Sequence, residues 1–393
     1  MSLAVVAVLV FDGIVVVHRR SSSPASLLEQ RLRALDRIAP KPDPALLASI
    51  DTATREVEAF VSATRGLRFT RSVPVRVLND VEFNSLLGAD ARPNPSQRRQ
   101  AEENLDVFSG LKFVTGHPDL YRLTQSRIED IAGIYSGPLQ ELFLRGEAVT
   151  PALRVTLAHE LTHALDDQHF GLRGRPRVDD HAYAYAALVE GDAVVVANRY
   201  LASRPPAEQQ AIGTIDLARL PAVRTATAAI PPTLLRIIQF PYGAGPSFVN
   251  ALITAGGEAR LDAAFHHPPQ TTAEILDPTR YLYPFPHRAN ATAPPAGGTV
   301  FQRGSLGAFR LLLLLQQVLP PTQARPAATR WGDDAYVAWR DHGLTCVRDR
   351  VVSLDAATGG LLEAALQRWA SADAATVDQQ RGPEGSLTFT MCN

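Results

Sequence analysis

The amino-acid sequence predicts a predominantly helical α+β fold with a small sheet, and three observations favour this fold class. Apolar residues recur at helical spacing through most of the 393 residues. Threonine, aspartate and proline stand at several expected helix starts, where they serve as caps or as first helical residues. The segments 131–135 and 141–145 flank a Ser-Gly-Pro turn and are typical of a β-hairpin.

The overall composition excludes one class of partner. The chain has 39 basic and 40 acidic residues, a formal net charge of −1 and no block of basic residues, so we expect no nucleic-acid partner. Its length is sufficient for one large domain or for two or three smaller ones. Only Lys41 and Lys112 are lysines, and this excess of arginine is typical of GC-rich bacterial genomes.

Residues 1–20 have the character of a signal or membrane-anchor segment, and residues 21–25 that of a linker. Leu3–Val17 is almost entirely apolar, which suits a signal peptide or a single truncated anchor better than a full bilayer span of about 20 residues. We therefore expect an extracytoplasmic protein that is membrane-anchored or secreted. The arginines that follow the apolar run oppose this topology under the positive-inside rule, and a buried strand pair is the alternative interpretation.

Residues 26–149 are expected to form an N-terminal α/β subdomain. Asp43 suits the N-cap of one of its helices, and Asp80 is expected to cap another. Periodicity predicts, in order, helices at 26–39 and 44–63, a strand at 73–78, helices from 80 and at 99–108, and then the hairpin.

Residues 150–393 are expected to form a helical core and a C-terminal helical subdomain. Thr150 and Pro151 suit the N-cap and first residue of a helix that runs to about Asp167. Asp180 opens a second helix, rich in alanine and valine, that runs through Tyr200. Further helices are predicted between proline-rich loops at 232–240, 246–255, 304–318, 333–342 and 361–370.

The two cysteines, Cys346 and Cys392, both lie in the C-terminal region. Neither belongs to a CxxC pair or lies near the histidines, so neither is expected to bind a metal. A disulfide between them is the preferred interpretation and would imply an oxidising compartment. Two separate buried thiols are the alternative.

The run from His159 to His163, His-Glu-Leu-Thr-His, carries the strongest chemical signal in the chain. Two histidines four residues apart lie on the same face of a helix and can share one Zn²⁺ ion. The intervening Glu160 can then polarise a water molecule that is bound to this ion. Helical periodicity places the apolar residues of this segment on the opposite face, towards the core.

A catalytic zinc ion needs three protein ligands and one open position. Glu190 is the first choice for the third ligand, followed by Asp192 and Asp180. Glu190 shares a helix face with small residues, so its helix can approach the helix of the two histidines closely. A glutamate in an apolar helix is costly to bury without a partner, and a metal ion removes that cost.

The segments HELTHALDDQHFGL, from His159, and ALVEGDA, around Glu190, resemble the gluzincin metallopeptidases, in which a glutamate from the next helix completes HExxH. More narrowly, they resemble a bacterial group of extracytoplasmic zinc peptidases with HELTHALxDQ followed by VEGDA. Stretches at 240–245, 268–274, 277–281 and 331–336 are also similar, although Asp277 stands where we expect a histidine in relatives. The resemblance implies a zincin-like metallopeptidase fold whose small sheet edges the active-site cleft.

The expected function is that of a zinc-dependent peptidase with His159, His163 and Glu190 as metal ligands and Glu160 as general base. Its partner would be a peptide or protein substrate; the sequence favours no oligomeric state. Tyr242 is the first choice for the group that stabilises the oxyanion, with Tyr281 and His181 behind it. The alternatives are an inactive binding protein on the same scaffold and a zinc hydrolase of a non-peptide substrate.

Overall fold

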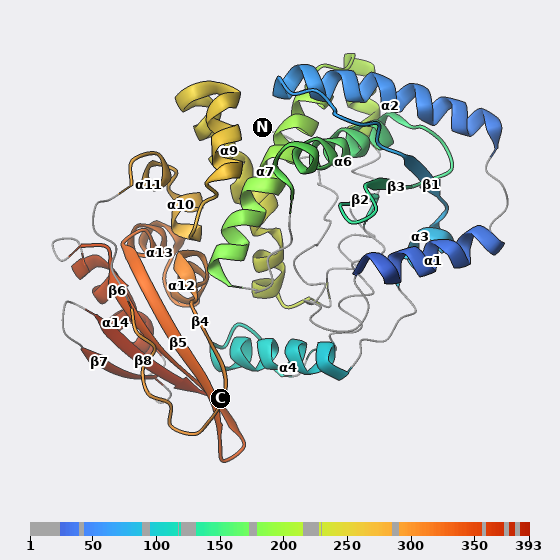
Figure 1. Cartoon of the computed structure of the whole chain (residues 1–393). Coiled ribbons are helices and arrows are strands. Elements are labelled where there is room, and N and C mark those ends of the chain that lie inside the picture. The colour runs from blue at the N-terminus through green and yellow to red at the C-terminus, as the bar shows by residue number, and fades with distance from the viewer. Residues whose placement is uncertain are drawn as a thin grey trace.

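The computed structural model has a predominantly helical α+β architecture (Figure 1). It describes residues 24–38, 43–88, 95–116, 118, 131–172, 179–214, 228, 230–284, 291–355, 359–372, 377–381 and 386–393. The predicted signal or anchor segment 1–20 lies outside the described residues, and Pro24, placed in the linker, already begins helix α1. Among the described residues, we find no helix whose length and apolar character would let it cross a membrane.

Helices and strands alternate along the chain, and the strands form two separate sheets. The helices are α1 (Pro24–Ile38), α2 (Pro44–Arg65), α3 (Asp80–Leu87), α4 (Pro95–Gly110), α6 (Pro151–Phe170), α7 (Asp180–Ala202), α9 (Pro232–His266), α10 (Thr272–Leu276), α11 (Thr279–Leu282), α12 (Gly307–Leu315), α13 (Pro321–Ala328) and α14 (Gly359–Ala372). The strands are β1 (Val75–Leu78), β2 (Gly133–Ser136), β3 (Glu141–Arg145), β4 (Thr299–Gly304), β5 (Trp331–Asp341), β6 (Leu344–Ser353), β7 (Val377–Arg381) and β8 (Leu387–Cys392).

The N-terminal half is built around α6, with α2, α7 and a small sheet packed against it (Figure 1). The sheet has three strands in the order β1-β3-β2, with β1 parallel and β2 antiparallel to β3. The predicted hairpin is thus confirmed as β2 and β3. Strand β2 is an edge strand of this sheet and packs against α6.

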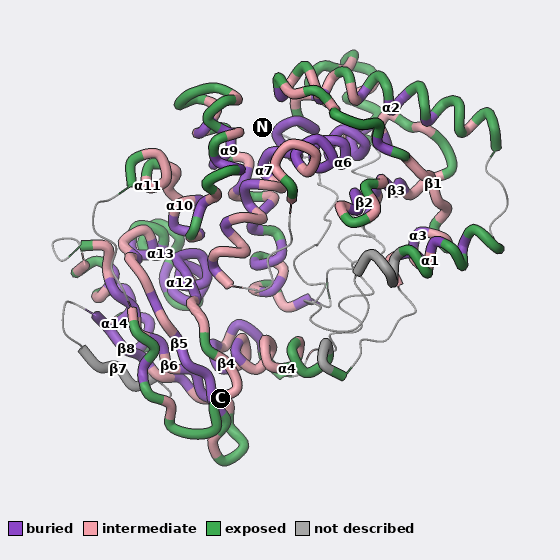
Figure 2. The backbone as a smooth tube through the Cα atoms, in the orientation of Figure 1, coloured by how far each residue is buried: buried purple, intermediate pink, exposed green. Residues whose placement is uncertain are grey.

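Helix α6 is buried along most of its length (Figure 2). Its predicted start is confirmed, since the side chain of Thr150 accepts a hydrogen bond from the Leu153 N–H at 3.1 Å and Pro151 is the first helical residue. Leu157 and Leu161 pack in the core with side chains of α2 and β3. Each fully buried leucine contributes about 1.5–3 kcal/mol, so the core fixes the rotation of α6 and the direction of its histidine face.

The C-terminal region contains an antiparallel five-stranded sheet in the order β4-β5-β6-β8-β7, so the helix predicted at 333–342 is wrong. That segment belongs to β5. The sequence feature that indicates a hairpin is the two-residue turn between β5 and β6, formed by His342 and Gly343. Their φ angles are 47° and 85°. Positive φ at both positions is typical of a type I′ hairpin turn. The subdomain is mixed rather than helical, with α12 and α14 packed against the sheet.

Residues 232–255 of α9 form one continuous helix instead of the two helices predicted with a loop between them. Pro241 and Pro246 lie inside it, and the chain leaves helical geometry at Gly256 and Gly257 instead. A proline removes one backbone hydrogen bond and normally interrupts a helix. Here the extensive packing of α9 on α7 offsets that loss.

Three local features concern the disulfide, the cap of α3 and the length of α12. The disulfide between Cys346 and Cys392 is confirmed, and it joins directly paired positions of β6 and β8. Asn79, rather than Asp80, caps α3, because its side chain accepts a hydrogen bond from the N–H of Glu82 at 3.0 Å. The helix predicted at 304–318 shortens to α12, since its first residue still belongs to β4.

Candidate metal centre

Helix α6 presents His159 and His163 on its face towards α7. The two residues are 4% and 8% exposed, so both imidazoles lie almost entirely inside the protein. Buried polar side chains are costly unless they have partners, and these two rings find theirs in each other and in a carboxylate from α7.

Helix α7 places Glu190 opposite the two histidines. The next residue, Gly191, is where α9 crosses: a Cβ atom on Gly191 would lie 2.5 Å from the carbonyl carbon of Gly245. A Cβ atom on Gly245 would lie 2.2 Å from the carbonyl oxygen of Ala187. The two glycines therefore permit a close approach of α7 and α9 beside Glu190.

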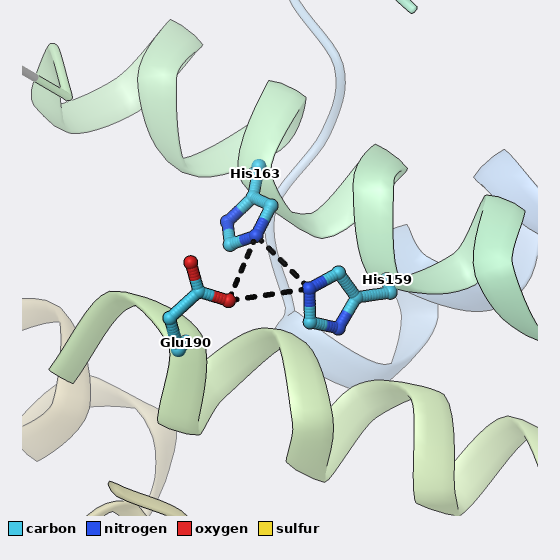
Figure 3. Close-up of side chains that lie close together, drawn as sticks. All are labelled: His159, His163 and Glu190. Carbon is cyan, nitrogen blue, oxygen red and sulfur yellow. Dashed lines mark hydrogen bonds and ion pairs between the residues drawn. The ribbon is translucent and has the colours of Figure 1, made fainter. Parts of the chain in front are cut away.

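The potential ligand atoms form a nearly equilateral triangle (Figure 3). The Nε2 atoms of His159 and His163 are 3.1 Å apart, and Oε2 of Glu190 lies 3.3 Å from the first and 3.4 Å from the second. Two ligand atoms of a tetrahedral zinc site, each about 2.0–2.1 Å from the metal, are about 3.3–3.4 Å apart. The three side chains could therefore hold a metal ion. Among the described residues, no other group of three histidines, cysteines or acids gathers in this way.

Hydrogen bonding within the protein does not satisfy these side chains. The two ring nitrogens can share one hydrogen bond, but Oε2 of Glu190 and Nδ1 of His163 are buried without a hydrogen-bond partner among the described residues. An unsatisfied buried polar group costs about 1–3 kcal/mol. A cation bound in the triangle would remove this cost for the carboxylate.

The three side chains also polarise one another. Burial opposes ionisation of Glu190, but the charges of His163 and His159 and the contacts with them lower its pKa to about 2. Burial likewise opposes protonation of His163, whereas Glu190 and then Glu160 and Asp166 raise its pKa to about 9. The carboxylate of Glu190 therefore stays ionised between the two rings.

Glu160 lies on α6, between the two histidines. One of its carboxylate oxygens accepts a hydrogen bond, and the other has no hydrogen-bond partner among the described residues. Its Oε2 accepts a hydrogen bond from the backbone N–H of Tyr135 in β2 at 2.8 Å, and its Oε1 has no partner among the described residues. Burial is the main cause of a raised pKa at Glu160, which the histidines partly oppose. Gly133 allows the strand to approach, since a Cβ there would lie 2.7 Å from Thr156 and 3.2 Å from Cγ of Glu160.

The two reserve candidates for the third ligand have other partners. Asp192 accepts a hydrogen bond from Nε of Arg65 at 2.8 Å. Asp180 accepts a hydrogen bond from the backbone N–H of Thr272 at 2.9 Å. Neither belongs to the cluster that contains Glu190.

The residues considered for the oxyanion lie in three different places. Tyr281 donates a hydrogen bond to the carbonyl oxygen of His267 at 2.7 Å, which is a structural contact. His181 is in the first turn of α7, about 13 Å along the axis from Glu190. Tyr242 is half-buried in α9, not in a loop, one turn before the crossing with α7. Its role stays a prediction.

Sequence reasoning missed Arg65, the fully buried last residue of α2. The buried stripe of α2 runs through Ile50, Val57 and Val61 at helical spacing, and Arg65 occupies its next position. A charged residue that continues an apolar stripe predicts a buried ion pair, and this signal was available in the sequence.

Comparisons with protein-family models, with curated proteins and with solved structures found no match to this chain.

Proposed function

We propose that this protein is a zinc-dependent metallopeptidase that uses His159, His163 and Glu190 as metal ligands. The observation that carries the proposal is the triangle of ligand atoms, whose edges of 3.1, 3.3 and 3.4 Å match a tetrahedral zinc site. The carboxylate oxygen of Glu190 supports it, because this buried atom makes no hydrogen bond within the described residues and faces the two imidazole nitrogens at 3.3 and 3.4 Å.

Glu160 is the proposed general base. A bound zinc ion supplies Lewis-acid polarisation of a water molecule and of the scissile carbonyl group. Glu160 takes the proton of the attacking water on its unpartnered Oε1 and later gives it to the leaving amine. The hydrogen bond from Tyr135 fixes the other carboxylate oxygen, so the side chain needs little reorganisation.

The edge strand β2 favours a peptide among the possible substrates. The carbonyl groups of Ala132 and Ser136 accept hydrogen bonds from the β3 side, so Gly133 and Tyr135 direct their backbone groups away from β3. The N–H of Tyr135 already points at Glu160. An extended peptide that approached this end of the sheet would lie beside the base, although Gly133 and Tyr135 are themselves packed against α6.

Two further assignments complete the proposal. We assign oxyanion stabilisation to Tyr242, since α9 crosses the ligand helix one turn after it. We also assign the protein to an extracytoplasmic location, as an anchored or secreted bacterial protein, and the disulfide between Cys346 and Cys392 is consistent with an oxidising compartment.

The experiment that tests the proposal compares wild-type protein with Glu160→Gln. We expect both proteins to bind one equivalent of zinc, measured by elemental analysis. The wild type should cleave a mixed peptide library in a chelator-sensitive way, and the variant should be about 10²–10⁴-fold slower because it lacks the base.

Each other outcome changes the proposal in a definite way. Absence of zinc from the wild type would refute the metal site. Stoichiometric zinc without cleavage of any peptide would favour a metal-binding protein or a hydrolase of another substrate, which ester substrates would separate. Undiminished turnover by Glu160→Gln would refute the assigned base.

A further inference from the structure

A cluster of charged side chains lies beside the metal site, centred on Arg65 at the end of α2. Arg65 is 1% exposed and meets four carboxylates from three other helices. Its Nε, Nη1 and Nη2 donate hydrogen bonds to Asp192, Glu258 and Asp262 at 2.8, 2.8 and 2.9 Å. Nη2 also lies 3.6 Å from Asp166. The planar guanidinium directs its donors rigidly, so these contacts fix the relative positions of the helices that make them.

Two of these carboxylates belong to the helices that carry the metal ligands. Asp166 lies one turn beyond His163 on α6, and Asp192 lies two residues beyond Glu190 on α7. The single cation of Arg65 therefore joins α6 to α7 close to the point where both helices present their ligands.

The carboxylates of Asp166 and Asp192 depend on this cation. Both residues are fully buried, and both oxygens of Asp166 and one of Asp192 have no hydrogen-bond partner among the described residues. Without Arg65, Oδ2 of Asp192 would lose its donor, and no guanidinium would span the gap between Asp192 on α7 and Asp166 on α6. The two helices could then shift relative to each other, which would widen the triangle of ligand atoms.

The chain that follows Arg65 binds the same part of α6. Oε1 of Gln168 accepts a hydrogen bond from the backbone N–H of Thr70 at 2.7 Å, and Nε2 of His169 lies 2.8 Å from the carbonyl oxygen of Arg68. The residues that follow α2 therefore hold the last turn of α6.

We infer that Arg65 is a positioning residue of the metal site, which holds α6 and α7 at the spacing that the three ligands need. The inference rests on the proposed zinc site, although not on the nature of the substrate. Arg199 offers a matched comparison: its Nη1 also binds Glu258, at 2.9 Å, but that ion pair joins α7 to α9.

The test measures metal binding rather than catalysis. Zinc affinity, from competition with a chromogenic chelator, and the visible absorption spectrum of the Co²⁺-loaded protein are compared among wild type, Arg65→Met, Arg65→Lys and Arg199→Met. We expect Arg65→Met to bind zinc about 10–100-fold more weakly, with altered Co²⁺ bands. Arg65→Lys should lose about 3–10-fold, because one ammonium group replaces a fork of five donors. Arg199→Met should stay within about twofold, as expected for a partly exposed ion pair.

Circular dichroism in the presence of chelator identifies which variants fold. Unchanged zinc affinity and Co²⁺ spectrum in a folded Arg65 variant would overturn the inference. If neither Arg65 variant folds, Asp192→Asn decides on the same two readouts, since it keeps the cation and removes its link to α7. Wild-type protein that binds neither metal would instead overturn the proposed function, so the two failures are distinguishable.

Discussion

Two carboxylates, the largely buried Glu190 at the candidate metal centre and the buried Asp334 on strand β5 of the C-terminal sheet, differ in what the chain provides for them. Asp334 accepts hydrogen bonds from Ser305 Oγ at 3.0 Å, from the N–H groups of Leu306 and Gly307 at 2.6 and 2.8 Å, and from Trp331 Nε1 at 2.8 Å. Both of its oxygens are satisfied. The chain thus completes this carboxylate by itself, and its role is to join β5 to the start of α12.

The metal centre lacks this completeness. Oε2 of Glu190, Oε1 of Glu160 and Nδ1 of His163 are buried without hydrogen-bond partners among the described residues. Native proteins leave few buried polar groups unpaired, because each costs about 1–3 kcal/mol. The comparison teaches that burial alone does not distinguish a structural carboxylate from a functional one. The unpartnered oxygen of Glu190 is informative only together with the two imidazole nitrogens beside it, since both oxygens of Asp166 and of Asp349 also lack hydrogen-bond partners among the described residues.

The largest expected effect tests the metal side of this comparison. Glu190→Gln should weaken zinc binding by more than about 100-fold. It replaces a charged metal ligand, whereas Arg65→Met removes only a residue that positions the ligands. Chelator competition measures the affinity. In the presence of chelator, Glu190→Gln should change the free energy of unfolding less than Asp334→Asn does. Zinc bound as tightly as by the wild type would show that Glu190 is not a ligand.

The second prediction tests the structural side. Asp334→Asn should lower the free energy of unfolding by about 2–4 kcal/mol, because an amide NH₂ would replace one acceptor oxygen and face a backbone N–H. Urea denaturation measures the loss, and zinc affinity should be unchanged. A parallel loss of zinc affinity would show that the two clusters are not independent.

The smallest effect concerns the pH dependence of stability. Burial, and then the charge of Asp334, raise the pKa of Asp349 well above its ordinary range. Burial also raises the pKa of Asp180 to about 7, although hydrogen bonds from Thr272 oppose the shift. An acid whose pKa is raised on folding stabilises the protein fully below its unfolded pKa, about 3.9, and this contribution is lost as the pH rises through the folded value.

Stability in chelator should therefore fall between about pH 4 and 7, the interval that the shift at Asp180 defines, and further at higher pH. Asp349→Asn should show a smaller fall, because the amide stays neutral. Urea denaturation across this range provides the measurement. An equal fall in wild type and variant would show that Asp349 is already ionised in the folded protein.

The elements that the sequence predicted correctly are those whose determinants are local. The start of α6 depends on Thr150 and Pro151, and its histidine face on spacing within one helix. Strand β5 was missed because Asp333 and Asp334 are unfavourable in strands, and pairing with β4 and β6 overrides that preference. The continuity of α9 through Pro241 likewise depends on packing against α7.

The sequence by itself determined the chemistry that is available: the HExxH pentad on a capped helix, a glutamate on the next long helix, and two cysteines able to pair. These follow from periodicity and residue type, which act over a few residues. Tertiary structure alone decided that Oε2 of Glu190 lies 3.3–3.4 Å from both imidazoles, that Glu160 is anchored by the N–H of Tyr135, and that Arg65 joins the two ligand helices. Such contacts depend on how helices cross, and that is set by packing between residues far apart in the chain.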